Sequence, residues 1–312
     1  MLSVVIYFGA YIFFPFLALA ALAVARGDRI IRGLAILALI PACILAWARF
    51  VEPAILNVKR ADILLPGATK ETSAIRVALF ADTHFGKFGN ALPMARIVET
   101  VNRQDVDLVL LAGDLVYHPK QTQITTEISA LEGLQAPVLA ILGNHDVGKP
   151  GRDNREAVRS AFTAVNIPLL EDEAKLIRLN GRTLAVSGLR DLWDDRALNT
   201  AFAADIPPDV PHITLAHNPD TAMYLSQDFE YDLMLSGHTH GGQIRLPFFY
   251  RAAIPCEGDW DKDLHTWRDA GGIDRQVWVT SGTGMVGLPF RFLQPPRIDI
   301  LTLHLPEASS VQ

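Results

Sequence analysis

Cysteine is scarce in this sequence, which excludes one common source of stability. Only Cys43 and Cys256 occur among its 312 residues. Cys43 lies in an apolar N-terminal stretch and Cys256 stands alone in the rest of the chain, so no disulfide can form within the C-terminal part. A folded domain there must be stabilised by its hydrophobic core.

Positive charge is also in short supply. The chain carries 28 lysines and arginines against 34 aspartates and glutamates, a formal net charge of -6. Binding to a nucleic-acid backbone requires clustered Lys and Arg, so this balance argues against a nucleic acid as partner. The chain has no internal repeat or low-complexity segment, and nothing in it indicates a protein partner.

Charge of either sign is absent from the first long hydrophobic run. Residues 3–25 contain no charged side chain, and a helix of this length, at about 1.5 Å of rise per residue, crosses roughly 30 Å of hydrocarbon. A second run covers residues 33–51, although Pro41 interrupts it and Arg49 lies near its end. A terminal arginine can reach the membrane interface. We predict that residues 1–52 form two transmembrane helices that anchor the chain in a membrane.

A cleaved signal peptide is the alternative for the first run. Ala23-Val24-Ala25 has the small-x-small form of a cleavage site. However, no basic segment precedes the run, and its apolar core is longer than that of a signal peptide. A second apolar run so soon afterwards also favours an anchoring hairpin.

The distribution of arginines bears on the orientation of this anchor. Arg26, Arg29 and Arg32 crowd the short connection between the two runs, whereas almost nothing charged precedes the first. The positive-inside rule therefore favours a cytoplasmic connection and an external C-terminal domain, which is periplasmic in a bacterial inner membrane. Lys59 and Arg60, which follow the second run, weaken the contrast.

From residue 75 onward, short apolar runs alternate with amphipathic stretches, a pattern typical of layered strands and helices. We expect a linker and leading strand over residues 53–74, a folded domain over 75–306 and a tail over 307–312. Buried strands are predicted over 75–81, 108–112, 138–142, 213–216, 233–235 and 298–305. Helices are predicted over 92–102, 122–134 and 155–164. Asn180-Gly181, between two further apolar runs, indicates a β-hairpin.

Residue types that bind metals follow five of the apolar runs. The clusters are Asp82-Thr83-His84, Gly113-Asp114, Gly143-Asn144-His145-Asp146, His217 and Gly237-His238-Thr239-His240. Taken singly, such residues more often serve as helix caps or as hydrogen-bonded structural histidines. Five clusters at five predicted strand ends instead indicate a metal site.

The ligand types constrain both the metal and the substrate. Carboxylates and imidazoles without thiolates suit Mn²⁺, Fe²⁺, Zn²⁺, Co²⁺ or Ni²⁺. The candidates are too many for one ion, but they give two divalent ions about four ligands each if one carboxylate bridges. They are Asp82, His84, Asp114, Asn144, His217, His238 and His240. The two carboxylates among them neutralise only part of the positive charge of two divalent ions. The site therefore attracts an anion such as a phosphate.

In their order along the chain, the five clusters resemble the motif set of the calcineurin-like metallophosphoesterase superfamily, over about residues 75–305. The apolar N-terminus and the segments 241–244 and 288–292 resemble a membrane-anchored bacterial subgroup of the YkuE and YaeI type. That subgroup is similar in form to membrane enzymes that hydrolyse UDP-2,3-diacylglucosamine. The resemblance implies an α/β fold, a four-layer αββα sandwich with helices on both outer faces, here preceded by the transmembrane helical hairpin.

The resemblance also implies roles for single residues. It divides the ligands between two metal ions: Asp82, His84 and His240 bind one, Asn144, His217 and His238 the other, and Asp114 bridges them. His145 is expected to face the leaving-group oxygen, and Asp146 to orient the imidazole of His145.

Contacts to the substrate are less well defined by the sequence. Arg190, Arg245 and Arg291 are candidates, because arginine forks onto phosphate oxygens, although solvated or ion-paired roles fit them equally. The aromatic segments 248–250 and 290–293 form either a lipid-facing lip beside the site or packing between strands.

Together these features predict a membrane-anchored hydrolase. It would cleave a phosphodiester or pyrophosphate bond of a membrane-associated substrate, for example a lipid-linked compound of the UDP-2,3-diacylglucosamine type, through hydroxide activated by two metal ions. A non-catalytic, metal-containing module that binds the cell envelope is the alternative. The acidic balance and the anchor argue against a nuclease.

Overall fold

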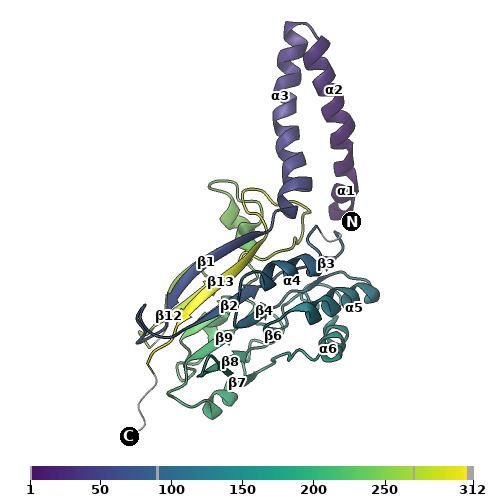
Figure 1. Cartoon of the computed structure of the whole chain (residues 1–312). Helices are drawn as coiled ribbons and strands as arrows, with labels where there is room; N and C mark the ends of the chain where they lie inside the picture. The colour runs from purple at the N-terminus through teal and green to yellow at the C-terminus, as the bar shows by residue number, and fades with distance from the viewer. Residues whose placement is uncertain (1, 89–90, 270, 308–312) are drawn as a thin grey trace.

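The computed structural model of this chain describes residues 2–88, 91–269 and 271–307. Residues 308–312 of the predicted tail lie outside this range. The described chain consists of a helical hairpin and a layered α/β body (Figure 1).

The hairpin projects from the body as two long arms (Figure 1). The first arm runs through α1 (Leu2–Gly9), η1 (Ala10–Ile12) and α2 (Phe13–Arg26), and the second through α3 (Arg29–Ala46), η2 (Trp47–Val51) and η3 (Glu52–Ala54). At the turn, the carboxylate of Asp28 caps α3 by accepting hydrogen bonds from the backbone N–H groups of Ile30 and Ile31, both at 2.9 Å. The second arm continues as a helix through Pro41.

By length and composition, the two arms, Val5–Arg26 and Arg29–Ala54, are long and apolar enough to cross a membrane. Their apolar side chains face outward: Leu19 is 67% exposed and Leu37 is 69% exposed. Helices that form the core of a soluble protein bury such side chains. The predicted helical hairpin is therefore present, with an outer surface suited to lipid.

The first sheet of the body has the strand order β1-β13-β2-β4-β6. Its strands are β1 (Asn57–Leu64), β13 (Arg297–His304), β2 (Ala74–Phe80), β4 (Leu108–Ala112) and β6 (Val138–Ile141). β2, β4 and β6 are parallel, as expected for strands linked by helices. β1, from the predicted linker and leading strand, pairs in parallel with β13 along its whole length.

The second sheet has the order β11-β12-β10-β9-β8-β7. Its strands are β11 (Asp263–Arg268), β12 (Asp274–Val279), β10 (Leu233–Ser236), β9 (His212–Leu215), β8 (Arg182–Gly188) and β7 (Glu173–Leu179). β7 and β8 form the predicted hairpin. Asn180 and Gly181 connect them with φ angles of 50° and 79°, as a type I′ turn requires.

The residues of β2 show why the strands are apolar throughout. Val77 and Leu79 face the second sheet, whereas Ala78 and Phe80 face helices on the opposite side, and all four are fully buried. A strand buried on both faces needs a continuous apolar run instead of an alternating one. The same argument explains the run in β4.

Helices complete the layers. The outer face of the first sheet is covered by α4 (Met94–Asn102), α5 (Gln121–Ser129) and α6 (Arg155–Ala164). The predicted helix over 122–134 ends as α5 at Ser129 and continues as the 3₁₀ turn η4 (Ala130–Gly133). Only short helical segments, η5 (Ala201–Asp205) and α7 (Thr221–Tyr224), lie over the second sheet in the described chain. The predicted α/β sandwich is thus confirmed.

The base of the hairpin is attached to the body by specific contacts. The backbone N–H of Arg291 donates to the carbonyl of Ala48 at 2.9 Å. On the first arm, the ring of Tyr7 stacks on Phe88 with 5.8 Å between ring centroids. Both arms therefore contact loops of the body.

Candidate metal centre

Parallel strands present their carboxyl ends at the same edge of a sheet, and the ligand-type side chains converge because these edges of the two sheets meet. Asp82 follows β2, Asp114 follows β4, Asn144 follows β6, His217 follows β9 and His238 follows β10. All five are buried. The structure therefore brings together the residues that the sequence placed at separate strand ends.

Two groups of three residues form candidate metal sites. The first is Asp82, His84 and His240, and the second is Asp114, His217 and His238. Within each group the ligand atoms all lie within 4.8 Å of one another. In the first group, the Nε2 atoms of His84 and His240 are 3.0 Å apart. Two imidazole nitrogens that face each other at this distance suit a shared cation.

Asp114 connects the two groups. Its Oδ2 lies 3.1 Å from Nε2 of His217 in its own group and 3.5 Å from Nε2 of His84 in the other. One carboxylate oxygen is thus within reach of both candidate sites. This is the placement that the sequence analysis expects of a bridging ligand.

Asn144 belongs to the second group by position. Its Oδ1 lies 2.9 Å from Nδ1 of His238, and its Nδ2 donates to the carbonyl of Lys149. The bond to Lys149 orients the amide so that its oxygen, the atom of an amide that can bind a metal, faces His238. The structure thus places Asn144 beside His238, a member of the second group.

A buried nitrogen without a well-formed hydrogen bond tests whether these residues fit a metal. Nδ1 of His217 hydrogen-bonds to the carbonyl of Ala112 at 2.7 Å, which leaves Nε2 directed into the centre. This Nε2 lies 3.1 Å from Oδ2 of Asp114, but among the described residues it makes no hydrogen bond of good geometry. Buried polar atoms normally have one, and metal-binding histidines are typically held by their other nitrogen in this way. The donor set therefore fits divalent metal ions.

Backbone strain is concentrated at the same residues. Non-glycine residues rarely adopt positive φ, and when they do the strain is often linked to function. Five of the candidate ligands do so, with φ of 53°, 44°, 54°, 70° and 52°: Asp82, His84, Asp114, His238 and His240. Glycine makes room for them, since a Cβ on Gly282 would lie 2.5 Å from Cβ of Asp82.

Burial shifts the pKa of several ligands, whereas for His217 the adjacent carboxylate of Asp114 outweighs burial and raises the pKa well above its usual value. It lowers the pKa of His84 and of His238 to about 3, so both imidazoles are neutral at physiological pH. Burial raises the pKa of the Asp82 carboxyl to about 7, because no solvent stabilises its charge. Neutral imidazoles are ready to bind a cation, whereas Asp82 must release its proton when one binds.

A cavity of about 480 Å³ opens over the centre. Asp114, His145 and His240 lie on its polar side. Other parts of its wall are apolar, formed by Trp193, Pro255, Val286 and Leu288 among others. A ligand bound here would meet both charged or polar groups and apolar side chains.

His145 lies where the sequence analysis expects a group that contacts the substrate. Its side chain lines the cavity, and its ring lies edge-on to that of His84 at 5.1 Å between centroids. Its backbone N–H donates to Oδ1 of Asp114 at 2.8 Å, which fixes it beside the centre. Burial lowers the pKa of its imidazole, so the ring is neutral at physiological pH.

The expected role of Asp146 needs a correction. Its buried carboxylate accepts hydrogen bonds from the backbone N–H groups of Leu115 and Val116, each at 3.0 Å, and of Gly143, at 2.9 Å. No hydrogen bond joins it to the imidazole of His145 in the described part of the chain. Asp146 therefore fastens two loops to each other and does not orient His145 directly.

The structure separates the three predicted arginines from the cavity. Arg190 pairs with Asp172 at 2.5 Å, and Arg245 pairs with Asp261 at 2.7 Å. Neither lines the cavity.

Arg291 is fully buried. Its guanidinium donates to four carbonyl oxygens at 2.8 to 3.2 Å, those of Gly284, Gln294, Ser281 and Gly282. With its donors directed at the backbone and no access to solvent, Arg291 is not a substrate contact in this structure.

Trp193 is a cavity residue that the sequence analysis missed. Its ring lies edge-on to His238 with 4.7 Å between centroids, and it lines the cavity. Trp193 follows β8, a parallel neighbour of β9. Its position beyond the carboxyl end of a parallel strand was the available signal.

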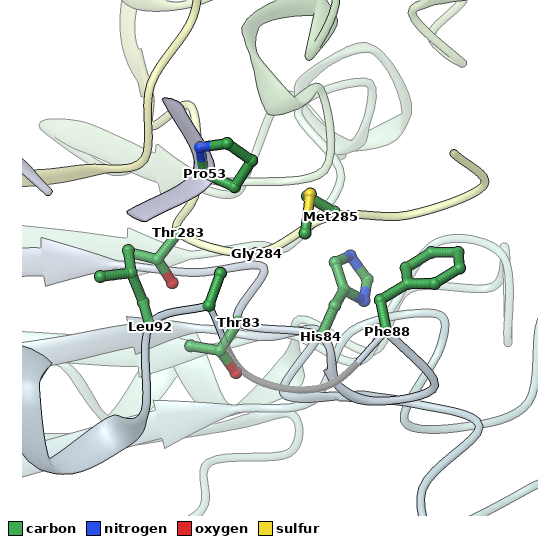
Figure 2. A pocket seen from close by; sticks show the side chains of 9 residues that line it. Pro53, Thr83, His84, Phe88, Leu92, Thr283, Gly284 and Met285 are labelled. Atoms are coloured by element: carbon green, nitrogen blue, oxygen red, sulfur yellow. The ribbon is translucent and has the colours of Figure 1, made fainter. Parts of the chain in front are cut away.

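A small cavity lies between the base of the hairpin and the candidate centre (Figure 2). Pro53 of η3 lies on one side, and Thr83 and His84 lie on the other, with Met285 and Phe88 close to His84 (Figure 2). The hairpin base is therefore a near neighbour of a candidate metal ligand.

Comparison with known proteins agrees with the motifs described above. A family model described as calcineurin-like phosphoesterase matches residues 75–242. The uncharacterized metallophosphoesterase YkuE of Bacillus subtilis is 28% identical over 261 residues, which cover 82% of this chain and 88% of YkuE. The phosphodiesterase YaeI of Escherichia coli is 31% identical over 239 residues, 73% of this chain and 82% of YaeI. The UDP-2,3-diacylglucosamine pyrophosphatase LpxG of Chlamydia trachomatis is 27% identical over 245 residues, 65% of this chain and 74% of LpxG.

Proposed function

Because the chain belongs to the calcineurin-like phosphoesterase family, a family of hydrolases with a dinuclear divalent metal centre, we propose that it hydrolyses a phosphodiester or pyrophosphate bond of an amphiphilic, membrane-associated compound. The observation that carries this proposal is the cavity. It joins two candidate metal sites linked by Asp114 to apolar wall residues, of which Val286 packs against the same apolar cluster as Tyr7 of the hairpin.

The residues divide the work in the following way. Asp82, His84 and His240 would hold one metal ion, Asn144, His217 and His238 would hold the second, and Asp114 would be within reach of both. When bound, two divalent ions supply positive charge that attracts a phosphate and acidifies water. His145 donates an N–H hydrogen bond to the leaving-group oxygen, which its place in the cavity wall supports.

The choice of an amphiphile follows from the wall and the hairpin. A charged phosphate fits the polar side of the cavity, whereas Trp193, Val286 and Leu288 suit an apolar group. An anchor in the membrane would also raise the effective concentration of a substrate in the same membrane. A UDP-2,3-diacylglucosamine-type lipid, the compound in the printed name of LpxG, has this chemistry.

The test uses the full chain in lipid nanodiscs. Metal content is measured first, and hydrolysis of bis-p-nitrophenyl phosphate and of a lipid-linked pyrophosphate is then followed with Mn²⁺. We expect about two metal ions per chain and activity that disappears in Asp114→Ala. Glu99→Gln is the matched control, because Glu99 is an exposed carboxylate on α4 paired with Arg103.

A second variant separates catalysis from metal binding. His145→Asn should retain both metal ions and lower kcat by about 10²- to 10⁴-fold, the usual contribution of such a group. His118→Asn serves as control, because His118 is exposed and its neighbour in the sequence, Tyr117, lies edge-on to the ring of His145. Two bound metal ions without turnover of any phosphate ester would favour the non-catalytic binding module.

Orientation in the membrane is tested independently. We infer from Arg26, Arg29 and Arg32 that the tip of the hairpin is cytoplasmic and the hydrolase domain external. Reporter fusions after residue 60 should therefore be active on the periplasmic side. A cytoplasmic result would contradict this orientation and would favour substrates made in the cytoplasm.

A further inference from the structure

We propose that two loops beside the candidate centre insert their apolar tips into the membrane leaflet from which the hairpin emerges. The centre would then accept a phosphate headgroup while the rest of the substrate remains in the bilayer. The tips, which together form the lip, are Leu246, Phe248, Phe249, Leu288 and Leu293. This inference rests on the membrane anchoring proposed above.

Exposure is the first observation. Phe248 is 97% exposed and Phe249 is 74% exposed, and the remaining lip residues, Leu246, Leu288 and Leu293, are between 40% and 56% exposed. The segment 246–249 reads Leu-Pro-Phe-Phe and contains no charge. Grouped apolar side chains on a surface normally mark a site for a partner or a membrane.

The two loops form one unit. Ile244 and Phe292 form a β-bridge, and the backbone N–H of Arg245 donates to the carbonyl of Phe292 at 2.8 Å. The side-chain amide of Gln243 donates to the carbonyls of Val286 and Leu288, at 3.0 and 2.9 Å. The lip residues therefore keep a fixed position relative to one another.

This unit is attached to the end of the hairpin. The N–H of Arg291 donates to the carbonyl of Ala48 at 2.9 Å, and the N–H of Gln294 donates to Oε1 of Glu52 at 2.7 Å. Leu293 lies between these two attachment points. Phe248 is four residues from Ile244, a reach of at most about 14 Å. If the hairpin spans the bilayer, its base is at the interface and the lip is at the same depth.

Aromatic residues at the hairpin base support this depth. Tyr11 is 52% exposed and Trp47 is 47% exposed, on the two arms. Tyr and Trp are enriched where helices leave the hydrocarbon for the headgroup region. Two arginines close to the lip are paired with carboxylates, Arg251 with Asp259 and Arg245 with Asp261. Apolar contact, not net charge, would therefore drive insertion, and a lipid surface fits better than a charged protein partner.

The same loops also form part of the cavity wall. Gln243, Ile244, Val286 and Leu288 line the cavity that contains Asp114 and His240. Leu288 belongs to both the lip and the cavity wall, so the lip is continuous with the wall of the cavity that contains the candidate centre. A phosphate compound with an apolar tail can reach the centre with its headgroup and leave its tail along the lip.

The experiment places a fluorescent label on the full chain in liposomes. Phe248→Cys, Phe249→Cys and Leu293→Cys are each labelled with an environment-sensitive dye, in a background of Cys43→Ser and Cys256→Ser. Leu37→Cys, on the exposed face of the hairpin, is the positive control. Leu176→Cys, 53% exposed on β7, is the negative control at the end of the body away from the hairpin (Figure 1).

Lipids that carry a nitroxide in the upper acyl chain should cause loss of fluorescence at the lip positions and leave the label at 176 unquenched. Quenching at 37 without quenching at 248, 249 or 293 would overturn the lip while the anchor stands. Protection of the lip from aqueous iodide without quenching by lipid would show that a second copy covers it, which also overturns the proposal. None of these readouts requires hydrolysis, so failure of the proposed activity is recognised separately.

Discussion

Glu52, in the last turn of the hairpin, accepts a hydrogen bond from the backbone N–H of Gln294 in the α/β body at 2.7 Å. Its other carboxylate oxygen accepts from the indole Nε1 of Trp47 at 3.0 Å, and Glu52 is only 4% exposed. A tether with a purely mechanical role does not need a buried hydrogen bond to the domain it holds. The base of the hairpin is instead a structural part of the domain.

Replacement of Glu52 should therefore destabilise the body. Glu52→Ala leaves the buried N–H of Gln294 without an acceptor, which costs about 1–3 kcal/mol, and the part-buried indole N–H of Trp47 loses its partner at a smaller cost. Glu52→Gln keeps one acceptor and should lose about half as much. Thermal unfolding in detergent, with Asp62→Asn as an exposed control, measures the difference. Equal melting temperatures for wild type and Glu52→Ala would show that the contact contributes nothing.

Arg291 extends the connection from the hairpin to the candidate centre. Its guanidinium holds the carbonyls of Ser281, Gly282 and Gly284, and the N–H of Gly284 donates to the carbonyl of Asp82 at 2.6 Å. The chain of contacts therefore runs from Ala48 through Arg291 to a candidate metal ligand.

Arg291→Met should lower both stability and metal affinity. Hydrogen bonds from a charged group contribute about 1.5–3 kcal/mol each, and the loss of several leaves buried carbonyls unpaired. We expect a lower melting temperature and, in titration calorimetry, a larger dissociation constant for Mn²⁺. An unchanged melting temperature combined with a raised KM would instead restore Arg291 as a substrate contact.

The sequence predicted those features that depend on local pattern. β4 and α6 begin and end where the apolar periodicity places them, and the turn at Asn180 and Gly181 follows from backbone preference alone. The convergence of the ligands also followed, because parallel strand ends share an edge.

Side-chain direction was not available from that pattern. Asp146 and Arg291 lie within recognisable motifs, but tertiary packing turned both toward backbone groups. The attachment of Ala48 and Glu52 to residues more than two hundred positions away has no local signal either. Such contacts depend on tertiary packing between elements far apart in the chain, which the local pattern of a single sequence does not predict.

Metal binding should depend on pH through Asp82. Burial raises the pKa of its carboxyl to about 7 in the metal-free protein, so below that pH a proton must leave before a cation binds. The apparent metal affinity should rise by up to about tenfold per pH unit below pH 7 and then level off. Titration calorimetry in two buffers of different ionisation enthalpy measures the released proton.

The same shift has a consequence for the metal-free protein. A carboxyl with a raised pKa is destabilised in its ionised form, so the contribution of Asp82 to stability is present below its unfolded pKa of about 4. That contribution is lost as the pH rises toward 7. Bound metal ions should reverse this trend. The free energy of unfolding is measured for the metal-free wild type and for Asp82→Asn, and the difference is taken at each pH. If this difference showed the contribution of Asp82 rising between pH 4 and 7, the raised pKa of Asp82 would be contradicted.

Substitution of Asp146 tests how the loops beside the candidate centre are stabilised. Its carboxylate accepts hydrogen bonds from three backbone N–H groups, those of Leu115, Val116 and Gly143. Asp146→Asn replaces one acceptor by an NH₂ group that faces those donors. We expect a loss of about 1–3 kcal/mol in the free energy of unfolding.

The kinetic consequence distinguishes the two roles considered for Asp146. If it only fastens the loops, kcat of Asp146→Asn measured well below the melting temperature should stay within about threefold of wild type, with an unchanged pH profile. If it orients His145, the wrong tautomer should lower kcat by a factor of 10² or more at unchanged melting temperature, as expected for a general acid–base partner. The hydrogen bonds in the structure favour the first outcome, because both carboxylate oxygens are already engaged by the backbone.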